Sequence, residues 1–124
     1  MLFRSALQLY PGSEHVNVQP HSGASANLAA FAASMQPGDR FVAMDLSQGG
    51  HLSHGAAVNV SGKWFTPTFY GVRSDDGLVD WDGVERAVAT AQPKIVIAGA
   101  SAYPRTLDFE RFAAIAHEIG RAHV

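Results

Sequence analysis

Apolar residues recur at helical spacing in three stretches of the chain. From Ser25 to Met35 they follow an i, i+3, i+4, i+7 pattern, which predicts a helix that ends at the turn Gln36 to Gly38. Asp80 is a suitable N-cap for a second helix, and Asp108 for a third. The residues expected on the buried faces of these three helices are Leu28, Phe31, Ala32 and Met35; Val84, Ala87, Val88 and Ala91; and Phe109, Phe112, Ala113 and Ala116.

Three other stretches have the composition of β-strands. Arg40 to Leu46 and Lys94 to Ala100 are mostly or continuously apolar, as expected for strands of a parallel sheet that helices cover on both faces. Trp64 to Tyr70 is rich in aromatic residues, but Pro67 has no N–H to donate, which favours an edge strand or an irregular strand. Helices and strands alternate, so we expect a three-layer α/β fold with a mainly parallel sheet.

The composition limits the possible functions. At 124 residues and 47% hydrophobic, the chain has the size of one domain and can bury a core. A formal net charge of −2 with nine Lys and Arg residues argues against binding to nucleic acid or to an anionic membrane. The absence of cysteine excludes disulfides and thiolate metal sites, and no apolar run resembles a membrane span or a signal peptide. We therefore expect a cytoplasmic protein.

A polar turn before the first predicted helix is a candidate anion site. Pro20 to Gly23 leads directly into that helix, whose unpaired N–H groups and dipole suit a phosphate. The alternative is that Ser22 and Gly23 only form a capping turn.

A second polar segment combines two glycines with two histidines. Gly49 and Gly50 lack side chains, which would let a flat ligand approach the backbone. His51 and His54 are three residues apart, but without a nearby Cys, Glu or third His they make a poor zinc site. The segment therefore favours a planar ligand, and we expect no metal.

These two segments and several others occur in the same order as in one known family. A single Ser-Gly or Gly-Gly-His match would be weak evidence, because short glycine motifs recur by chance. Together the motifs resemble serine hydroxymethyltransferase, an enzyme that uses pyridoxal phosphate (PLP). The resemblance implies part of a large domain of the PLP-dependent transferases, with the aspartate aminotransferase-like fold type I. The matching stretches are 15–27, 45–55, 58–63, 69–71, 93–99, 101–105 and 108–120.

The resemblance assigns cofactor contacts to five positions. Ser22, Gly23 and Ala24 would bind the phosphate, although many relatives have a serine where this chain has Ala24, so one hydroxyl contact is absent. His51 would be the catalytic imidazole that stacks on the cofactor ring. Ser101 follows an apolar strand and would form a hydrogen bond near the phenolic oxygen of PLP; the alternative is a serine that caps a turn.

The resemblance also assigns tetrahydrofolate contacts to Leu46, Gly49, Gly50 and Leu52. The alternative for the two leucines is that they are core residues. We expect His54 to form a structural hydrogen bond close to the site.

The segments that complete the site in this family are absent. The family continues with an aspartate for the pyridine nitrogen, a histidine in Asp-x-Ala-His, and a Thr-His-Lys segment whose lysine bonds covalently to the cofactor. The chain has two lysines, Lys63 and Lys94, and neither lies in such a segment. Residues 121–124 contain Ala-His without the aspartate, and we assign no role to His123. The chain alone is therefore expected to be inactive.

Both ends have sequences that common sequencing-adapter DNA would encode. We expect residues 1–5 and 119–124 to be non-native tails, and residues 6–118 to be a partial PLP-binding large domain. Ile119 and Gly120 are ambiguous, because the family often has Ile-Gly at this point.

The sequence thus predicts the N-terminal part of the large domain of a serine hydroxymethyltransferase. The complete parent would interconvert serine and glycine with tetrahydrofolate as one-carbon carrier and PLP as cofactor, and would be a homodimer or homotetramer. Two alternatives remain. One is another fold-type-I PLP enzyme, an aldolase or aminotransferase, which would not need the segment from Gly49 to Leu52. The other is a non-catalytic α/β module that binds a different phosphate ligand.

Overall fold

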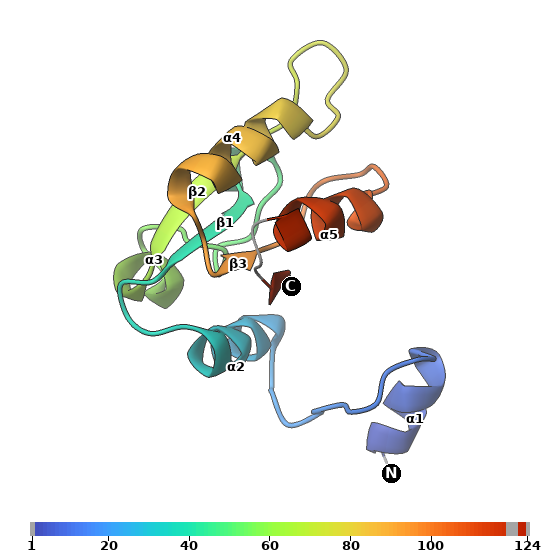
Figure 1. The fold of residues 1–124 in the computed structure, drawn as a ribbon. Coiled ribbons are helices and arrows are strands. Elements are labelled where there is room, and N and C mark those ends of the chain that lie inside the picture. Colours follow the sequence, from blue (N-terminus) through green and yellow to red (C-terminus); the bar gives the residue numbers. More distant parts are fainter. Residues whose placement is uncertain (1, 119–121, 124) are drawn as a thin grey trace.

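The computed structural model describes residues 2–118 and 122–123, and its centre is a parallel β-sheet (Figure 1). The strand order is β2-β1-β3-β4, and each neighbouring pair is parallel. β2 is an edge strand, which confirms the position inferred from Pro67. The strands are β1 (Arg40–Met44), β2 (Thr66–Tyr70), β3 (Ile95–Val96) and β4 (Ala122–His123).

The two faces of the sheet have separate cores, because successive residues of a strand point to opposite faces. One face packs against α4 (Trp81–Ala91) and α5 (Phe109–Glu118), and the other packs against α2 (Gly23–Ser34). Figure 1 shows α4 and α5 on one side of the sheet and α2 on the other. The predicted three-layer α/β fold is therefore confirmed. The strand residues of the first core are Val42, Met44, Tyr70 and Val96; those of the second are Phe41, Ala43 and Ile95, which Ile97 joins just after β3.

The helix α4 forms as its sequence predicts. Asp80 is the N-cap, and its carboxylate accepts a hydrogen bond from the Gly83 N–H at 3.1 Å. The four buried residues of α4 are the four expected ones, Val84, Ala87, Val88 and Ala91.

The buried face of α2 is only partly as predicted. Phe31 and Met35 are buried, whereas Leu28 is half-buried and Ala32 is exposed. The helix is rich in alanine on all sides. Spacing alone therefore does not determine which face meets the sheet, and the large Phe31 side chain does.

In α5, Phe112 and Ala116 are buried as expected, and Ala113 is half-buried. The prediction for Phe109 is wrong, because this side chain is 61% exposed. Phe109 is the first residue of α5 and lies outside the core cluster, whereas Ile115 completes the buried stripe with Phe112.

The two predicted central strands are shorter than expected. After Met44 the chain leaves the sheet through a short 3-10 helix, η1 (Leu46–Gln48), because the Asp45 carboxylate accepts from the Ser47 N–H at 2.7 Å. On the other strand, Ile97 donates to the Val42 carbonyl at 2.8 Å. The pairing with β1 ends at Val96, although β1 itself continues to Met44, so the expected strand as far as residue 100 does not form.

Two α-helices were not predicted. Trp64 ends the short helix α3 (Val60–Trp64) and does not begin a strand. At the N-terminal end, α1 (Leu2–Leu9) lies apart from the sheet at the end of an extended segment (Figure 1). Within the described residues, no helix has the length and apolar character to cross a membrane.

The structure describes only part of the two segments predicted to be non-native tails. Residues 1, 119–121 and 124 lie outside the described residues. β4, which contains His123, falls within the segment predicted to be non-native. The assignment of residues 1–5 and 119–124 as tails stays a prediction.

Candidate functional site

The N-terminal end of α2 is closed by a reciprocal capping box. The Ser22 hydroxyl accepts from the Ser25 N–H at 3.2 Å, and the Ser22 N–H donates to the Ser25 hydroxyl at 3.2 Å. The Ser25 hydroxyl also donates to the Ser22 carbonyl at 2.9 Å. Ser22 is therefore a true capping residue. Capping does not exclude a ligand, since the N–H groups of Gly23 and Ala24 precede any helical carbonyl partner.

Gly23 leaves open space at this helix end. A Cβ added at Gly23 would meet no other atom within 4 Å. Among the residues that the structure describes, none packs where a side chain at Gly23 would lie, so an approaching ligand would have room.

The two glycines before His51 have a different role from the one expected. A Cβ at Gly50 would lie 2.1 Å from the Met44 carbonyl oxygen. Gly49 has φ +116°, and a Cβ there would lie 3.2 Å from the backbone of Ala102. The chain's own backbone therefore fills the space that the sequence suggested for a flat ligand, and that interpretation of the glycine pair is wrong.

This close approach joins two segments of the site. The carbonyl oxygen of Gly49 accepts hydrogen bonds from the N–H groups of Ser101 at 2.8 Å and Ala102 at 3.0 Å. Ser101 is consequently fixed beside the loop that carries His51. Ser101 is exposed and lies in the segment that follows the carboxyl end of β3.

The His51 ring is held by Ser53. The Ser53 N–H donates to His51 Nδ1 at 3.1 Å, and the Ser53 hydroxyl lies 2.7 Å from the same nitrogen. Asn27 Nδ2 donates to that hydroxyl at 2.7 Å, so the network continues to α2.

The hydrogen bond expected from His54 is not made at its Nδ1 atom. The residue is buried, and its Nδ1 has no hydrogen-bond partner among the described residues. Burial lowers the pKa of His54, and the neighbouring His51 lowers it further. The two rings lie edge to face with centroids 5.7 Å apart. In the described ranges, no three His, Cys, Asp or Glu side chains gather where they could hold a metal ion.

A hollow of about 200 Å³ brings three of the predicted cofactor-binding residues together. Gly23, His51 and Ser101 come from distant parts of the sequence, and all three line it. The other two predicted residues, Ser22 and Ala24, line a second cavity of about 190 Å³ at the same end of α2. The remaining residues of the hollow are Asn27, His54 and Ala100.

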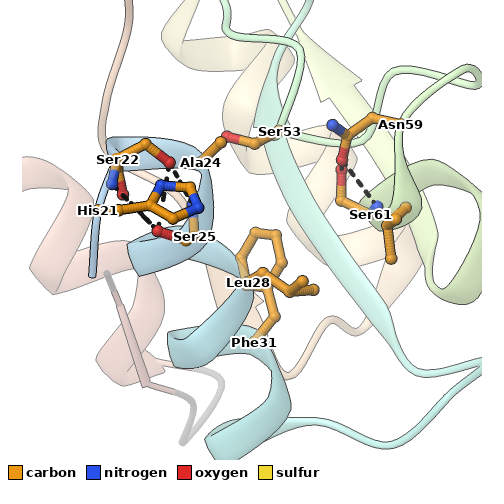
Figure 2. Close-up of a pocket in the computed structure, with 10 residues that line it drawn as sticks. His21, Ser22, Ala24, Ser25, Leu28, Phe31, Ser53, Asn59 and Ser61 are labelled. Atoms are coloured by element: carbon orange, nitrogen blue, oxygen red, sulfur yellow. Dashed lines mark hydrogen bonds between the residues drawn. The ribbon is translucent and has the colours of Figure 1, made fainter. Parts of the chain in front are cut away.

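Figure 2 shows this second cavity between the first turns of α2 and the segment that carries Asn59 and Ser61. Ser22 and Ser25 lie at its α2 side, and Ser53 also lines it. The apolar residues Leu28 and Phe31 also line it. The start of α2 thus borders both hollows, and Ser53 lines the second one.

The predicted folate positions do not form one cavity. Leu46 and Leu52 are 48% and 46% exposed, so the alternative that they are core residues is wrong. Leu46 lines an apolar cavity of about 420 Å³ with Val58 and Phe69. Gly49 and Gly50 are buried by the backbone contacts described above.

Comparison with known proteins assigns the family. A sequence model of the family described as serine hydroxymethyltransferase matches residues 3–124. The chain belongs to the serine hydroxymethyltransferase family. It is 59% identical over 109 residues to the serine hydroxymethyltransferase of Rhodospirillum centenum, and this match covers 88% of the chain and 25% of that protein. It is 54% identical over 115 residues to the serine hydroxymethyltransferase of Phenylobacterium zucineum, which covers 93% of the chain and 27% of that protein.

The chain thus spans about a quarter of the length of these curated relatives. Membership of the family confirms the resemblance seen in the motifs. It also favours serine hydroxymethyltransferase over the two alternatives, a different fold-type-I PLP enzyme and a non-catalytic phosphate-binding module.

Sequence reasoning missed Asn27 and Ser53 as members of the site. A signal for Asn27 is its position one helical turn after Gly23, which places it on the same side of α2. Ser53 lies two residues after His51, a spacing at which a serine can bond back to a ring nitrogen.

Proposed function

We propose that this chain is the N-terminal part of the large domain of an enzyme that interconverts serine and glycine with tetrahydrofolate as one-carbon carrier. Its native part is residues 6–118. The observation that carries the proposal is the hollow lined by Gly23, His51 and Ser101, because three residues that the resemblance assigns to one cofactor converge there.

The start of α2 fits the phosphate of PLP. The N–H groups of Gly23 and Ala24 have no carbonyl partner within the helix, and the positive end of the helix dipole favours a dianion. The open space at Gly23 allows close approach. The Ser22 hydroxyl now contacts the Ser25 hydroxyl at 3.2 Å, so it can donate to a phosphate by turning away from Ser25.

His51 and Ser101 would hold the rest of the cofactor. The planar His51 ring would stack on the pyridine, and the Ser101 hydroxyl would bond near the phenolic oxygen. When bound, PLP supplies the electron sink for chemistry at the amino acid. The residues of this chain bind and orient it. The lysine that bonds covalently to PLP would come from the part of the parent that this chain does not contain.

The substrate and partner assignments extend the same proposal. The exposed Leu46 and Leu52 would contact tetrahydrofolate, with Gly49 and Gly50 shaping the loop between them. Serine and glycine would be the amino acid substrates of the parent. We propose a cytoplasmic homodimer or homotetramer for the parent, on the basis of the resemblance and the absence of cysteine.

Binding of PLP to this chain tests the proposal. We expect pyridoxal, which lacks the phosphate, to bind roughly ten- to a hundredfold more weakly than PLP, since each lost hydrogen bond to a charged group has an effect of this size. Gly23→Leu fills the open space and should weaken PLP binding by a similar factor while pyridoxal binding changes little. Ala29→Leu, at an exposed position of the same helix, is the matched control.

Two results would count against it. Equal affinities for PLP and pyridoxal would show that the start of α2 does not bind the phosphate. Displacement of PLP by simple phosphosugars would favour a non-catalytic phosphate-binding module.

A further inference from the structure

A buried hydroxyl connects α2 to the His51 ring. Asn27 Nδ2 lies 2.7 Å from the Ser53 hydroxyl, which in turn lies 2.7 Å from His51 Nδ1. Ser53 is 4% exposed, so water competes little for these contacts. The three residues come from the first helix of the site and from the loop after the glycine pair.

The direction of each hydrogen bond follows from the Ser53 backbone. The Ser53 N–H can only donate, and it points at His51 Nδ1 at 3.1 Å. Nδ1 must therefore be the unprotonated nitrogen of the neutral ring, and the ring hydrogen is on Nε2. The Ser53 hydroxyl then donates its one hydrogen to Nδ1 and accepts from the Asn27 amide.

We propose that Ser53 and Asn27 are positioning residues, which hold the neutral His51 ring in its Nε2–H tautomer and fix its orientation at the hollow. The significance for catalysis rests on the proposed function, in which His51 contacts PLP. Asn27 lies one turn after Gly23 on α2, and both line the hollow. The helix that presents N–H groups to a phosphate therefore also sets the position of the ring.

Fixing the tautomer and orientation of the His51 ring before a ligand binds has a physical advantage. A histidine without fixed partners exchanges between two tautomers and several ring orientations. A ring whose one nitrogen is held by a neighbour keeps the other nitrogen in a defined protonation state and direction. Less orientational freedom is then lost when a planar ligand binds against the ring.

Nitrogen NMR of the histidine rings in the full 124-residue chain tests this proposal. At a pH where the rings are neutral, we expect His51 to be a single Nε2–H tautomer, whereas the exposed His15 gives averaged signals. Ser53→Ala keeps the backbone N–H that donates to Nδ1 but removes the hydroxyl donor, so it should lower the His51 tautomer ratio only partly, roughly three- to tenfold. Ser53→Thr keeps the hydroxyl and should preserve the ratio.

Asn27→Asp tests the direction of the network. A carboxylate can only accept, so it takes the Ser53 hydroxyl hydrogen away from His51 and should lower the ratio as Ser53→Ala does. Ser61→Ala is the matched control, because Ser61 is also buried and hydrogen-bonded, but to Asn59 and Gly55. It should leave the His51 signals unchanged.

The proposal is overturned if His51 in the unmodified chain is as averaged as His15, or if Ser53→Ala leaves its tautomer ratio unchanged. It is also overturned if Ser61→Ala disturbs His51 as much as Ser53→Ala does, because the effect would then be a general loss of packing. PLP binding to the same samples separates the two proposals. A fixed tautomer without PLP binding contradicts the proposed function alone, whereas PLP binding with an averaged His51 contradicts the positioning role alone.

Discussion

Ser22 and His51 lie at different parts of the proposed cofactor site, so their variants should fail differently in the complete enzyme. Ser22→Ala removes a charge-assisted hydrogen bond to the phosphate, worth about 1.5–3 kcal/mol, and PLP retention should weaken roughly ten- to a hundredfold. His51→Ala leaves the N–H groups of α2 in place, so PLP should stay bound while serine turnover falls. Dialysis of PLP and turnover at saturating PLP measure the two effects.

Ser22→Thr is the control for the first variant, because threonine keeps the hydroxyl that caps α2. If His51→Ala loses the cofactor yet turns over normally at saturating PLP, the stacking role is wrong. If Ser22→Ala retains PLP normally, the phosphate role of the hydroxyl is wrong.

The glycines of the site show what the sequence could not predict. Gly23, His51 and Ser101, which the resemblance assigns to one cofactor, line one hollow. The motifs could not distinguish Gly23, which faces open space, from Gly50, whose missing side chain is required by the Met44 carbonyl. That difference depends on a contact between segments, and no local pattern encodes it.

Among the elements, α4 offers the clearest test of how local sequence sets structure. Asp80→Ala removes the side chain that accepts from the Gly83 N–H, and should lower the free energy of unfolding by about 1 kcal/mol. Asp82 lies in the first turn of the same helix but is not its cap. Asp82→Ala therefore removes one negative charge and no capping side chain, and should lower the free energy of unfolding by only about 0.3 kcal/mol. Urea unfolding measures both, and equal losses would contradict the capping role.

The lengths of helices and strands were less predictable than their positions. The start of α4 was predicted because its cap is local. The end of β3 was not, because the apolar run continues to residue 100 whereas the pairing with β1 ends at Val96. Likewise, α3 is only five residues long and begins at the Asn59 cap, a signal too short to stand out beside the aromatic run that follows.

For the whole molecule, the absence of the covalent lysine predicts an inactive chain. Lys63 and Lys94 are both exposed, and Lys94 Nζ lies 2.7 Å from an Asp39 carboxylate oxygen. Neither is the positioned, desolvated amine that covalent binding of PLP requires. We expect no serine hydroxymethyltransferase activity from the chain, and borohydride reduction should not fix PLP at one defined lysine. Specific fixation that is abolished by Lys63→Arg or Lys94→Arg would contradict this.

The exposed apolar surface predicts self-association. Several large apolar side chains near the edge strand β2 are open to solvent, among them Val58 at 76% and Trp64 at 56% exposure. Exposed apolar groups beside a strand edge favour association. Sedimentation velocity should show species that grow with concentration, and Val58→Asp with Trp64→Asp should reduce them. A monomer at every concentration in the unmodified chain would speak against this.

A titration of the nitrogen-labelled chain with PLP, at dilution sufficient to limit association, tests most directly whether one cofactor contacts all three segments. We predict that the amide signals of Gly23, Ala24 and Ser101 and the ring signals of His51 shift together with a single Kd. Inorganic phosphate should move only Gly23 and Ala24, the N–H groups at the start of α2. If PLP binds while the His51 ring signals and the Ser101 amide signal stay unchanged, the proposed cofactor site is contradicted.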